Sequence, residues 1–374
     1  MTTQLQSRCH CGKSVFTVAF RTESLPISND YCHCTTCRHA TGELALNQGP
    51  IQGVPLTKEG DKPVDLTTTL TAYNSSEWAT RYFCTTCSAH MIFHDHRRPS
   101  WAIAVSTLER VTGVVDIGFH MFVLDTKDGG LADHFPFYKG VELPRYAGLP
   151  GSQTLARGWH LANQTEGVDQ ARASQENLAG YCHCKAISFT ISRPSTPSES
   201  PRLRASYPDL LHPHHSTSPE VLRNPNEEQW WIRGDGTKYL AGYCACSGCC
   251  LSSGSDVMGW AFVPRCNVTW TTQVPASATC FDLQDTSSRP KELKQYCPSE
   301  DTRHEFCGTC GATAFFWKST EPDILQVAVG LLDADVGVRA ETWLDWHRER
   351  VGYEEEATNV AVVEGIKARR AGIM

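Results

Sequence analysis

The sequence predicts a mainly β protein made of two tandem copies of one small, cysteine-rich domain. Three observations support this prediction. Short segments rich in β-branched and aromatic residues recur along the chain, long amphipathic helices are missing, and one pattern of cysteines occurs twice. The length of 374 residues also exceeds the ~100–200 residues of a usual single domain, which favours two domains.

The individual elements follow from local patterns. Strands are predicted where β-branched and aromatic residues concentrate, over residues 15–20, 101–105, 187–191 and 324–329. Each C-x-x-C pair follows an aromatic residue and precedes small residues, which is typical of a metal-binding turn at the tip of a hairpin. The Pro- and Ser-containing stretch 193–226 predicts an exposed insertion. Short helices are expected over 164–177 and over 359–374.

The cysteine pattern reads C-x-C, then C-x-C-x-x-C, then C-x-x-C in each half of the chain. The clustered cysteines are Cys9, Cys11, Cys32, Cys34, Cys37, Cys84 and Cys87, and then Cys182, Cys184, Cys244, Cys246, Cys249, Cys307 and Cys310. Their surroundings repeat as well, since Tyr73 lies eleven residues before Cys84 and Tyr296 lies eleven before Cys307. We therefore predict a duplication, with domains over 1–140 and 178–350, a linker over 141–177 and a tail over 351–374.

Composition narrows the classes of partner. The formal net charge is −7 and no basic run is longer than an Arg pair, which disfavours nucleic acid as a partner. No stretch of 18 apolar residues occurs and the N-terminus does not resemble a signal peptide, so the sequence predicts a cytoplasmic protein without a membrane partner. In a reducing compartment, 18 cysteines in tight clusters indicate metal binding rather than a disulfide framework. Nothing in the sequence indicates an oligomeric state.

The cysteine spacings favour zinc, because two thiolates of a C-x-x-C turn can reach one tetrahedral ion. Seven cysteines in each half divide into four plus three. We predict closed four-cysteine sites and open three-cysteine sites that leave one position for water or substrate. The closed sites are Cys9, Cys11, Cys84 and Cys87, and Cys182, Cys184, Cys307 and Cys310; the open sites are Cys32, Cys34 and Cys37, and Cys244, Cys246 and Cys249.

Three alternatives remain open for these cysteines. Both sites of a half could be structural, with His33 or a distant histidine completing the second. An iron–sulfur cluster is possible on ligand type, and a disulfide framework is the general alternative for a cysteine-rich chain. Four cysteines have no counterpart in the cysteine pattern of the first half and are interpreted as small packing residues: Cys250, Cys266, Cys280 and Cys297.

The motifs resemble one family. Cys-His-Cys-Gly over 9–12, Cys-His-Cys-Thr-Thr-Cys-Arg over 32–38 and Phe-Cys-Thr-Thr-Cys over 83–87 are similar to the glutathione-dependent formaldehyde-activating enzymes, a family that also contains centromere protein V. The second half, with Tyr-Cys-His-Cys over 181–184 and Phe-Cys-Gly-Thr-Cys-Gly-Ala over 306–312, resembles a second copy. The arrangement is similar to that of tandem, fungal-type members.

The resemblance implies a fold of stacked, β-tent-like sheets with one structural four-cysteine zinc and one catalytic three-cysteine zinc in each domain. It also implies chemistry at carbon–sulfur bonds, since the type activity adds glutathione to formaldehyde and is formally a carbon–sulfur lyase run in reverse. The substrate that the resemblance implies is a small thiol adduct, with glutathione as the candidate thiol, or another small electrophile. The rival interpretation is a non-catalytic zinc module that binds another protein.

Two further residues are candidates for a catalytic role. Arg38 follows the first open triad and could bind an anionic substrate, or it could be a solvated surface side chain; Cys250 replaces it in the second half. His120 matches a family segment that begins with histidine and could face the open zinc, or it could be a structural histidine on a strand. The copies also differ where Ser88 replaces Gly311, so the first turn must form without glycine.

Overall fold

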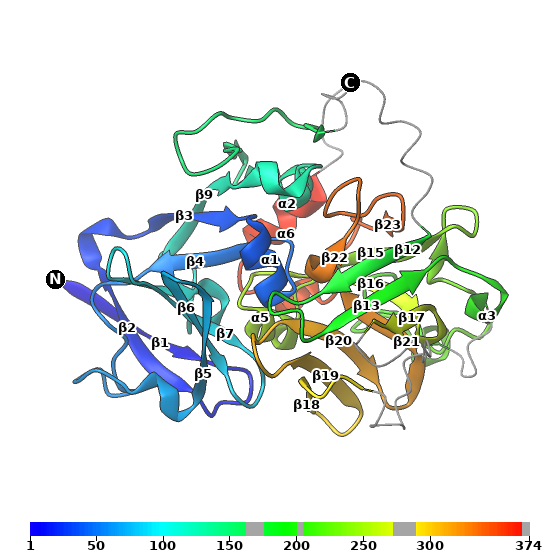
Figure 1. Ribbon diagram of the computed structural model, residues 1–374, viewed down its shortest axis with the longest axis horizontal. Helices are drawn as coiled ribbons and strands as arrows, with labels where there is room; N and C mark the ends of the chain where they lie inside the picture. The colour runs from blue at the N-terminus through cyan, green and yellow to red at the C-terminus, as the bar shows by residue number, and fades with distance from the viewer. Residues whose placement is uncertain (162–175, 200–204, 272–288, 369–374) are drawn as a thin grey trace.

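The computed structural model describes residues 1–161, 176–199, 205–271 and 289–368, and this part of the chain is mainly β, as the sequence predicts (Figure 1). The first half contains the strands β1 Thr2–Arg8, β2 Val15–Arg21, β3 Ile27–Cys32, β4 Leu46–Pro50, β5 Leu70–Ser76, β6 Ala79–Cys84, β7 His90–Asp95, β8 Ser100–Ala104, β9 Val115–Met121, β10 Phe137–Tyr138 and β11 Val141–Glu142. Its helices are α1 Thr35–Thr41 and α2 Gly130–His134.

The second half contains a longer series of elements. Its strands are β12 Asn177–Tyr181, β13 Ser188–Ser192, β14 Ile232–Arg233, β15 Lys238–Cys244, β16 Met258–Pro264, β17 Val268–Trp270, β18 Leu293–Tyr296, β19 Thr302–Cys307, β20 Thr313–Lys318, β21 Glu321–Ala328, β22 Leu332–Asp333 and β23 Leu344–Trp346. Its helices are α3 Thr196–Glu199, α4 Pro219–Leu222, α5 Ser247–Ser253 and α6 Val360–Lys367. The predicted strands and the terminal helix are therefore present, whereas most of the helix expected over 164–177 lies outside the described residues.

The main sheets of the two halves have the same strand order. In the first half the order is β5-β6-β7-β8-β4-β3-β9, with β3 and β9 parallel. In the second half the corresponding strands follow in the order β18-β19-β20-β21-β16-β15, with β23 paired to β15 in parallel, and the short strand β14 is added next to β15. Strands that lie next to equivalent cysteine motifs in the two halves therefore pair with equivalent neighbouring strands. We propose on this ground that the halves are duplicated domains.

The C-x-x-C pairs lie at hairpin turns between β6 and β7 and between β19 and β20. Each turn is closed by a backbone hydrogen bond, from Ser88 N–H to the Cys84 carbonyl at 2.9 Å and from Gly311 N–H to the Cys307 carbonyl at 2.8 Å. Ser88 and Gly311 both adopt left-handed backbone conformations, with φ of 61° and 81°. Serine thus takes the conformation that glycine takes in the other copy, at some cost in backbone strain.

The two halves pack together along reciprocal contacts. Helix α1 of the first half lies against the 3-10 turn Val329–Leu331 of the second, and α5 of the second lies against the 3-10 turn Val105–Thr107 of the first. Figure 1 shows α1 and α5 at the centre, between the blue-to-cyan first half and the green-to-orange second half. Helix α6 returns to pack against β10. One buried apolar cluster includes side chains from both halves, so the halves share a core.

Two segments differ from their predicted environments. The insertion over 193–226 is not simply exposed, because Tyr207, Asp209 and Leu210 are buried in it. Residues 143–155 of the predicted linker fold back on the first half, where His120 N–H donates to the Pro144 carbonyl at 2.8 Å. In the described part of the chain, no helix is both long and apolar enough to cross a membrane.

Candidate metal centres

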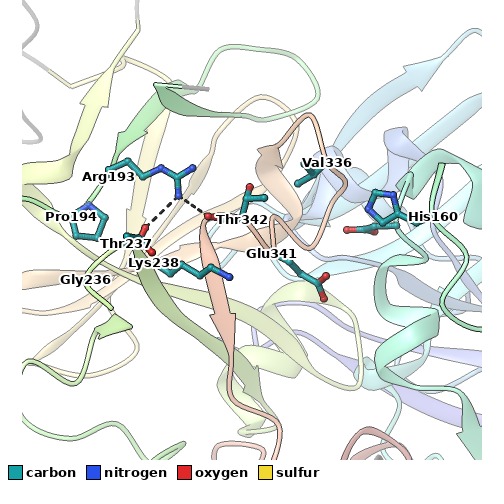
Figure 2. A pocket seen from close by; sticks show the side chains of 10 residues that line it. His160, Arg193, Pro194, Gly236, Thr237, Lys238, Val336, Glu341 and Thr342 are labelled. Carbon is teal, nitrogen blue, oxygen red and sulfur yellow. Dashed lines mark hydrogen bonds between the residues drawn. The ribbon is translucent and has the colours of Figure 1, made fainter. Parts of the chain in front are cut away.

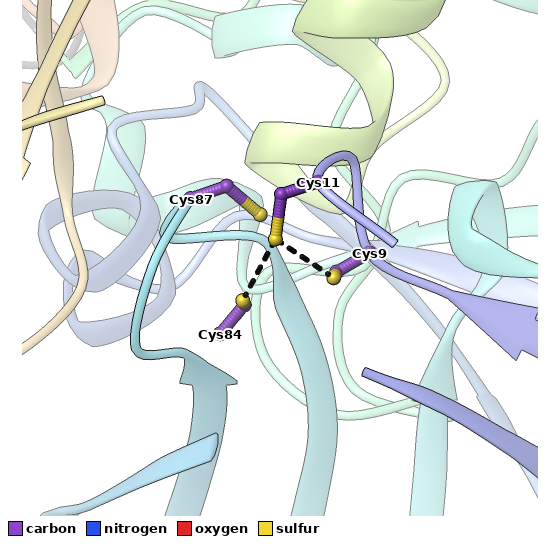
Figure 3. A group of neighbouring side chains, drawn as sticks. All are labelled: Cys9, Cys11, Cys84 and Cys87. Atoms are coloured by element: carbon purple, nitrogen blue, oxygen red, sulfur yellow. Dashed lines mark hydrogen bonds between the residues drawn. The ribbon is translucent and has the colours of Figure 1, made fainter. Parts of the chain in front are cut away.

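The structure gathers the cysteines into four groups, and the sulfurs of each group lie within 4.8 Å of one another. In the first group Cys11 Sγ is 3.5 Å from Cys9 Sγ and 3.6 Å from Cys84 Sγ, and Figure 3 shows these side chains and Cys87 pointing toward a common centre. Sulfurs bound at ~2.3 Å to one tetrahedral zinc lie about 3.8 Å apart, whereas a disulfide brings two sulfurs to about 2.05 Å. The spacing fits a shared metal ion and excludes disulfides within the group.

The corresponding group in the second half has the same geometry. Cys184 Sγ lies 3.5 Å from both Cys182 Sγ and Cys307 Sγ, and Cys310 completes the group. In each copy a backbone N–H points at the first sulfur, from Ser14 to Cys9 at 3.2 Å and from Ile187 to Cys182 at 3.4 Å. Donation to sulfur favours the thiolate form that a metal requires. Each four-cysteine group therefore connects the C-x-C turn after the first strand of its half to the C-x-x-C hairpin turn of the same half.

The three-cysteine groups lie where a strand of the main sheet passes into a short helix. Cys32 ends β3, while Cys34 caps α1 by accepting a hydrogen bond from Cys37 N–H at 3.3 Å. Cys246 caps α5 in the same way, accepting from Cys249 N–H at 3.3 Å. Among the described residues, no histidine or carboxylate joins either group of three sulfurs. Each group therefore offers three ligands and could hold a metal with one position left for another molecule.

His33 does not join the first open group, because it is fully buried and pairs with His120. The His33 Nε2 lies 3.0 Å from the His120 Nδ1, and the His120 Nε2 lies 2.9 Å from the Phe135 carbonyl oxygen. Since a carbonyl only accepts, His120 Nε2–H donates to Phe135 and His120 Nδ1 accepts from His33. Burial lowers the pKa of His120 to about 3, so it stays neutral. This position favours the structural interpretation of His120.

Arg38 lies in the junction between the halves rather than at a solvent-facing site. Its Nη1 donates to the carbonyls of Gly330 at 2.8 Å and Leu332 at 2.7 Å, and only 3% of the residue is exposed. Cys250, its counterpart, is buried and donates to the Asp256 carbonyl at 3.0 Å. The geometry favours a role for Arg38 in joining the halves over the anion-binding role considered from the sequence.

Sequence reasoning missed Arg81, which contacts the first open group. Its Nη2 donates to Cys37 Sγ at 3.1 Å and its Nε donates to Ser75 Oγ at 3.2 Å, in a side chain that is almost fully buried. A buried guanidinium stabilises a neighbouring thiolate. His304 occupies the corresponding position, three residues before Cys307. That shared spacing from the C-x-x-C pair is the signal that could have identified both residues.

The second open group borders two small cavities. One of about 50 Å³ is lined by Cys246 and Cys249 together with His10 of the first half and His304. Another of about 90 Å³ is lined by the same two cysteines and by Asp209 of the insertion. The insertion therefore forms part of the wall beside the second open group, a position that its composition alone did not indicate.

A larger cavity of about 710 Å³ contains none of the clustered cysteines. Figure 2 shows Arg193 at its edge, donating hydrogen bonds to the carbonyls of Thr237 and Thr342, while Glu341 and His160 lie across from it. Because both hydrogen bonds of the Arg193 Nη1 go to backbone carbonyls, this guanidinium holds the loops of the second half together.

The four cysteines that lack a counterpart in the first half have different environments. Cys250 is buried, as a packing residue should be, whereas Cys266 and Cys297 are exposed, which contradicts a packing role for these two. Cys280 lies outside the described residues.

The match to a family model supports the resemblance of the motifs in the first half. Residues 4–123 match the family model described as glutathione-dependent formaldehyde-activating enzyme. No curated protein matches the chain. A crystal structure of a Rhodobacter sphaeroides protein aligns with 45% of this chain and 98% of its own, at 15% identity and a TM-score of 0.24. The matched range includes all three cysteine motifs of the first half, so this part of the chain is similar to the glutathione-dependent formaldehyde-activating enzymes.

Proposed function

We propose that the protein is a zinc-dependent enzyme of the carbon–sulfur lyase type, acting on a thiol adduct such as that of glutathione, or on a small electrophile. The observation that carries the proposal is the division of the clustered cysteines into two groups of four sulfurs and two groups of three. Four sulfurs complete a tetrahedral site, whereas three leave a position for a reacting molecule. The family match of residues 4–123 supports the same class of chemistry.

In this proposal the four-cysteine groups hold structural zinc and fix the turns of each half. The three-cysteine groups hold zinc that, when bound, supplies Lewis-acid chemistry toward a carbonyl or thiol. The protein's own residues shape the surroundings of that position. Arg81 donates to Cys37 Sγ and offsets the negative charge of the first open group, while Trp260 and Phe316 give the cavity beside the second group an apolar wall. Such a wall limits the access of water.

Cysteine variants separate catalytic from structural roles. We expect Cys34→Ser combined with Cys246→Ser to abolish the catalysed combination of glutathione with formaldehyde, measured by NMR against the spontaneous reaction, and to leave the near-UV circular dichroism unchanged. Cys37→Ser should likewise abolish turnover at the first site without unfolding the chain. Cys87→Ser removes a ligand of a closed group and should unfold the first half. Equal loss of structure in the Cys37 and Cys87 variants would show that the groups are misassigned.

The same experiment distinguishes the rival function. If the zinc-loaded parent chain does not accelerate formation of the adduct, or of adducts of other small aldehydes, the lyase proposal is wrong. A non-catalytic zinc module for protein binding would then be the better account of the four cysteine groups.

A further inference from the structure

Two histidine–tyrosine pairs connect the halves in opposite directions. His10, between Cys9 and Cys11, has its Nδ1 2.8 Å from the hydroxyl of Tyr296 in the second half. His183, between Cys182 and Cys184, has its Nδ1 2.6 Å from the hydroxyl of Tyr73 in the first half. The rings meet edge-on in both pairs, at interplanar angles of 77° and 80°. The same contact is therefore built twice, once from each half.

The first pair places an imidazole of the first half beside the open group of the second. A Cβ added to Gly248 would lie 3.4 Å from His10 Nε2 and 3.9 Å from Cys246 Sγ. His10 lines the cavity of about 50 Å³ together with Cys246 and Cys249. Because the Tyr296 hydroxyl occupies Nδ1, the atom left for a ligand is Nε2.

The second pair has a matching position on α1. The His183 N–H donates to the His39 carbonyl at 2.9 Å, and His39 Nδ1 lies 2.7 Å from the Tyr181 carbonyl. The rings of His39 and Tyr181 stack with centroids 4.2 Å apart. The turn that carries His183 is thus held on the helix that contains Cys37, while His10 lies beside Gly248 of α5.

We propose that each open three-cysteine site is shared between the halves, with His10 serving the site of the second half and His183 that of the first. When the tyrosine hydroxyl donates to Nδ1, the imidazole carries its hydrogen on Nε2 and can donate it to a ligand. The group that accepts this hydrogen is a hydroxyl or carbonyl oxygen of a small thiol adduct. This choice of ligand rests on the proposed function. The cavity of about 50 Å³ suits such a small group, since one water occupies roughly 30 Å³ of liquid. Both histidines therefore contact the ligand directly.

A crossed binding experiment on the full chain tests this arrangement. The chain is loaded with Co²⁺, and the visible bands of its open sites are followed while 2-mercaptoethanol or ethanethiol is added. These two probes differ in the hydroxyl that the histidine would bind. The Cys34→Ser background keeps only the second open site intact, and the Cys246→Ser background keeps only the first.

In the Cys34→Ser background, we expect His10→Phe to weaken 2-mercaptoethanol binding roughly five- to tenfold, the effect of losing one hydrogen bond. Ethanethiol binding should not change, and His183→Phe should have no effect. In the Cys246→Ser background the roles of the two histidines should exchange. Tyr296→Phe and Tyr73→Phe should reproduce the respective effects in part, and they test the proposal even if a histidine variant disturbs its neighbouring cysteines.

The proposal is overturned if each histidine affects only the open site of its own half, or if no variant changes binding. It is also overturned if a histidine variant weakens the binding of both probes equally. Turnover of the glutathione adduct is measured separately. If each histidine does not affect the open site of the other half but turnover is retained, the shared sites alone are contradicted. If each histidine does affect the other half's site but there is no turnover, the lyase function alone is contradicted.

Discussion

His134 is a buried imidazole that stays neutral because protonating it in the folded protein costs too much. Burial lowers its pKa to about 3, against an opposing effect of Glu341, whose Oε1 lies 3.9 Å from His134 Nε2. Arg339 and Arg348 also lower the pKa. The His134 Nδ1 lies 2.8 Å from the Tyr243 hydroxyl, so the contact joins the first half to the second.

The pH dependence of stability follows from this depressed pKa. Below about pH 6.5 the unfolded chain binds a proton at His134 that the folded protein does not bind, so the free energy of unfolding falls as the pH drops. Between pH 7 and 5.5, the free energy of unfolding should fall by about 1 kcal/mol less in His134→Asn than in the parent protein, as measured by urea unfolding. Tyr243→Phe, the control, should destabilise at every pH without changing the slope. Identical slopes in the parent and His134→Asn would contradict this account.

At the residue scale, the sequence predicts the cysteine groups but not the side chains around them. Covalent spacing and ligand chemistry fix which cysteines can share a metal, and the structure brings together the groups so predicted. The environments of Arg38 and His120 depend on the junction between halves, which no local pattern encodes. Tyr73 and Tyr296 illustrate the difference, since their repeated spacing was visible in the sequence and their histidine partners were not.

At the scale of elements, the two C-x-x-C turns share a backbone conformation but differ in their surroundings. A Cβ added to Gly311 would lie 2.5 Å from Cγ of Phe83, which belongs to the first half. Ser88 takes the same left-handed conformation with its buried hydroxyl unpartnered within the described residues. Glycine is therefore required at 311 by packing, whereas at 88 serine is tolerated at a cost.

Exchanging residues at these turns should have opposite effects. Gly311→Ala adds an overpacking cost of ~1–3 kcal/mol to the strain of a left-handed alanine, so we expect a loss of about 2 kcal/mol or more in the free energy of unfolding. Ser88→Gly relieves strain and removes an unpaired hydroxyl, and should be neutral or stabilising by up to about 1 kcal/mol. Thermal unfolding of the zinc-loaded variants measures both. A stable Gly311→Ala protein would show that Phe83 does not enclose this turn.

The strands near the cysteines could be predicted because β-branched and aromatic residues mark them, as in β2 and β13. The insertion was misjudged because Pro and Ser indicate turns but say nothing of what the turns cover. Its buried Tyr207 and Leu210 belong to the apolar cluster that also contains the sheet of the second half. Local composition predicts loop geometry better than loop burial.

At the scale of the whole molecule, the halves are joined by buried polar groups as well as by apolar contacts. Asp256 of the second half accepts hydrogen bonds from the Tyr31 hydroxyl at 2.5 Å and from Asn47 Nδ2 at 2.9 Å in the first half. Separation of the halves would break these bonds and expose the shared core. The repeat predicts two domains, but only the structure shows how closely they are integrated.

This integration predicts cooperative unfolding. Because one buried cluster includes side chains of both halves, urea should unfold the zinc-loaded chain in a single transition by fluorescence and circular dichroism. Asp256→Leu, which leaves Tyr31 and Asn47 without their shared acceptor, should lower the midpoint. Two well-separated transitions in the parent chain would indicate that the halves are stable alone and that their junction contributes little.

The central claim is that fourteen cysteines form two closed and two open zinc sites. Elemental analysis combined with X-ray absorption at the zinc edge tests it most directly. We predict four zinc ions per chain and no iron. The average zinc ion should have 3.5 sulfur ligands, because fourteen sulfurs are shared among four ions, and about half an oxygen or nitrogen ligand, because only the two open sites bind one. Two zinc ions per chain, or four ions that each have a complete shell of protein ligands, would contradict the account.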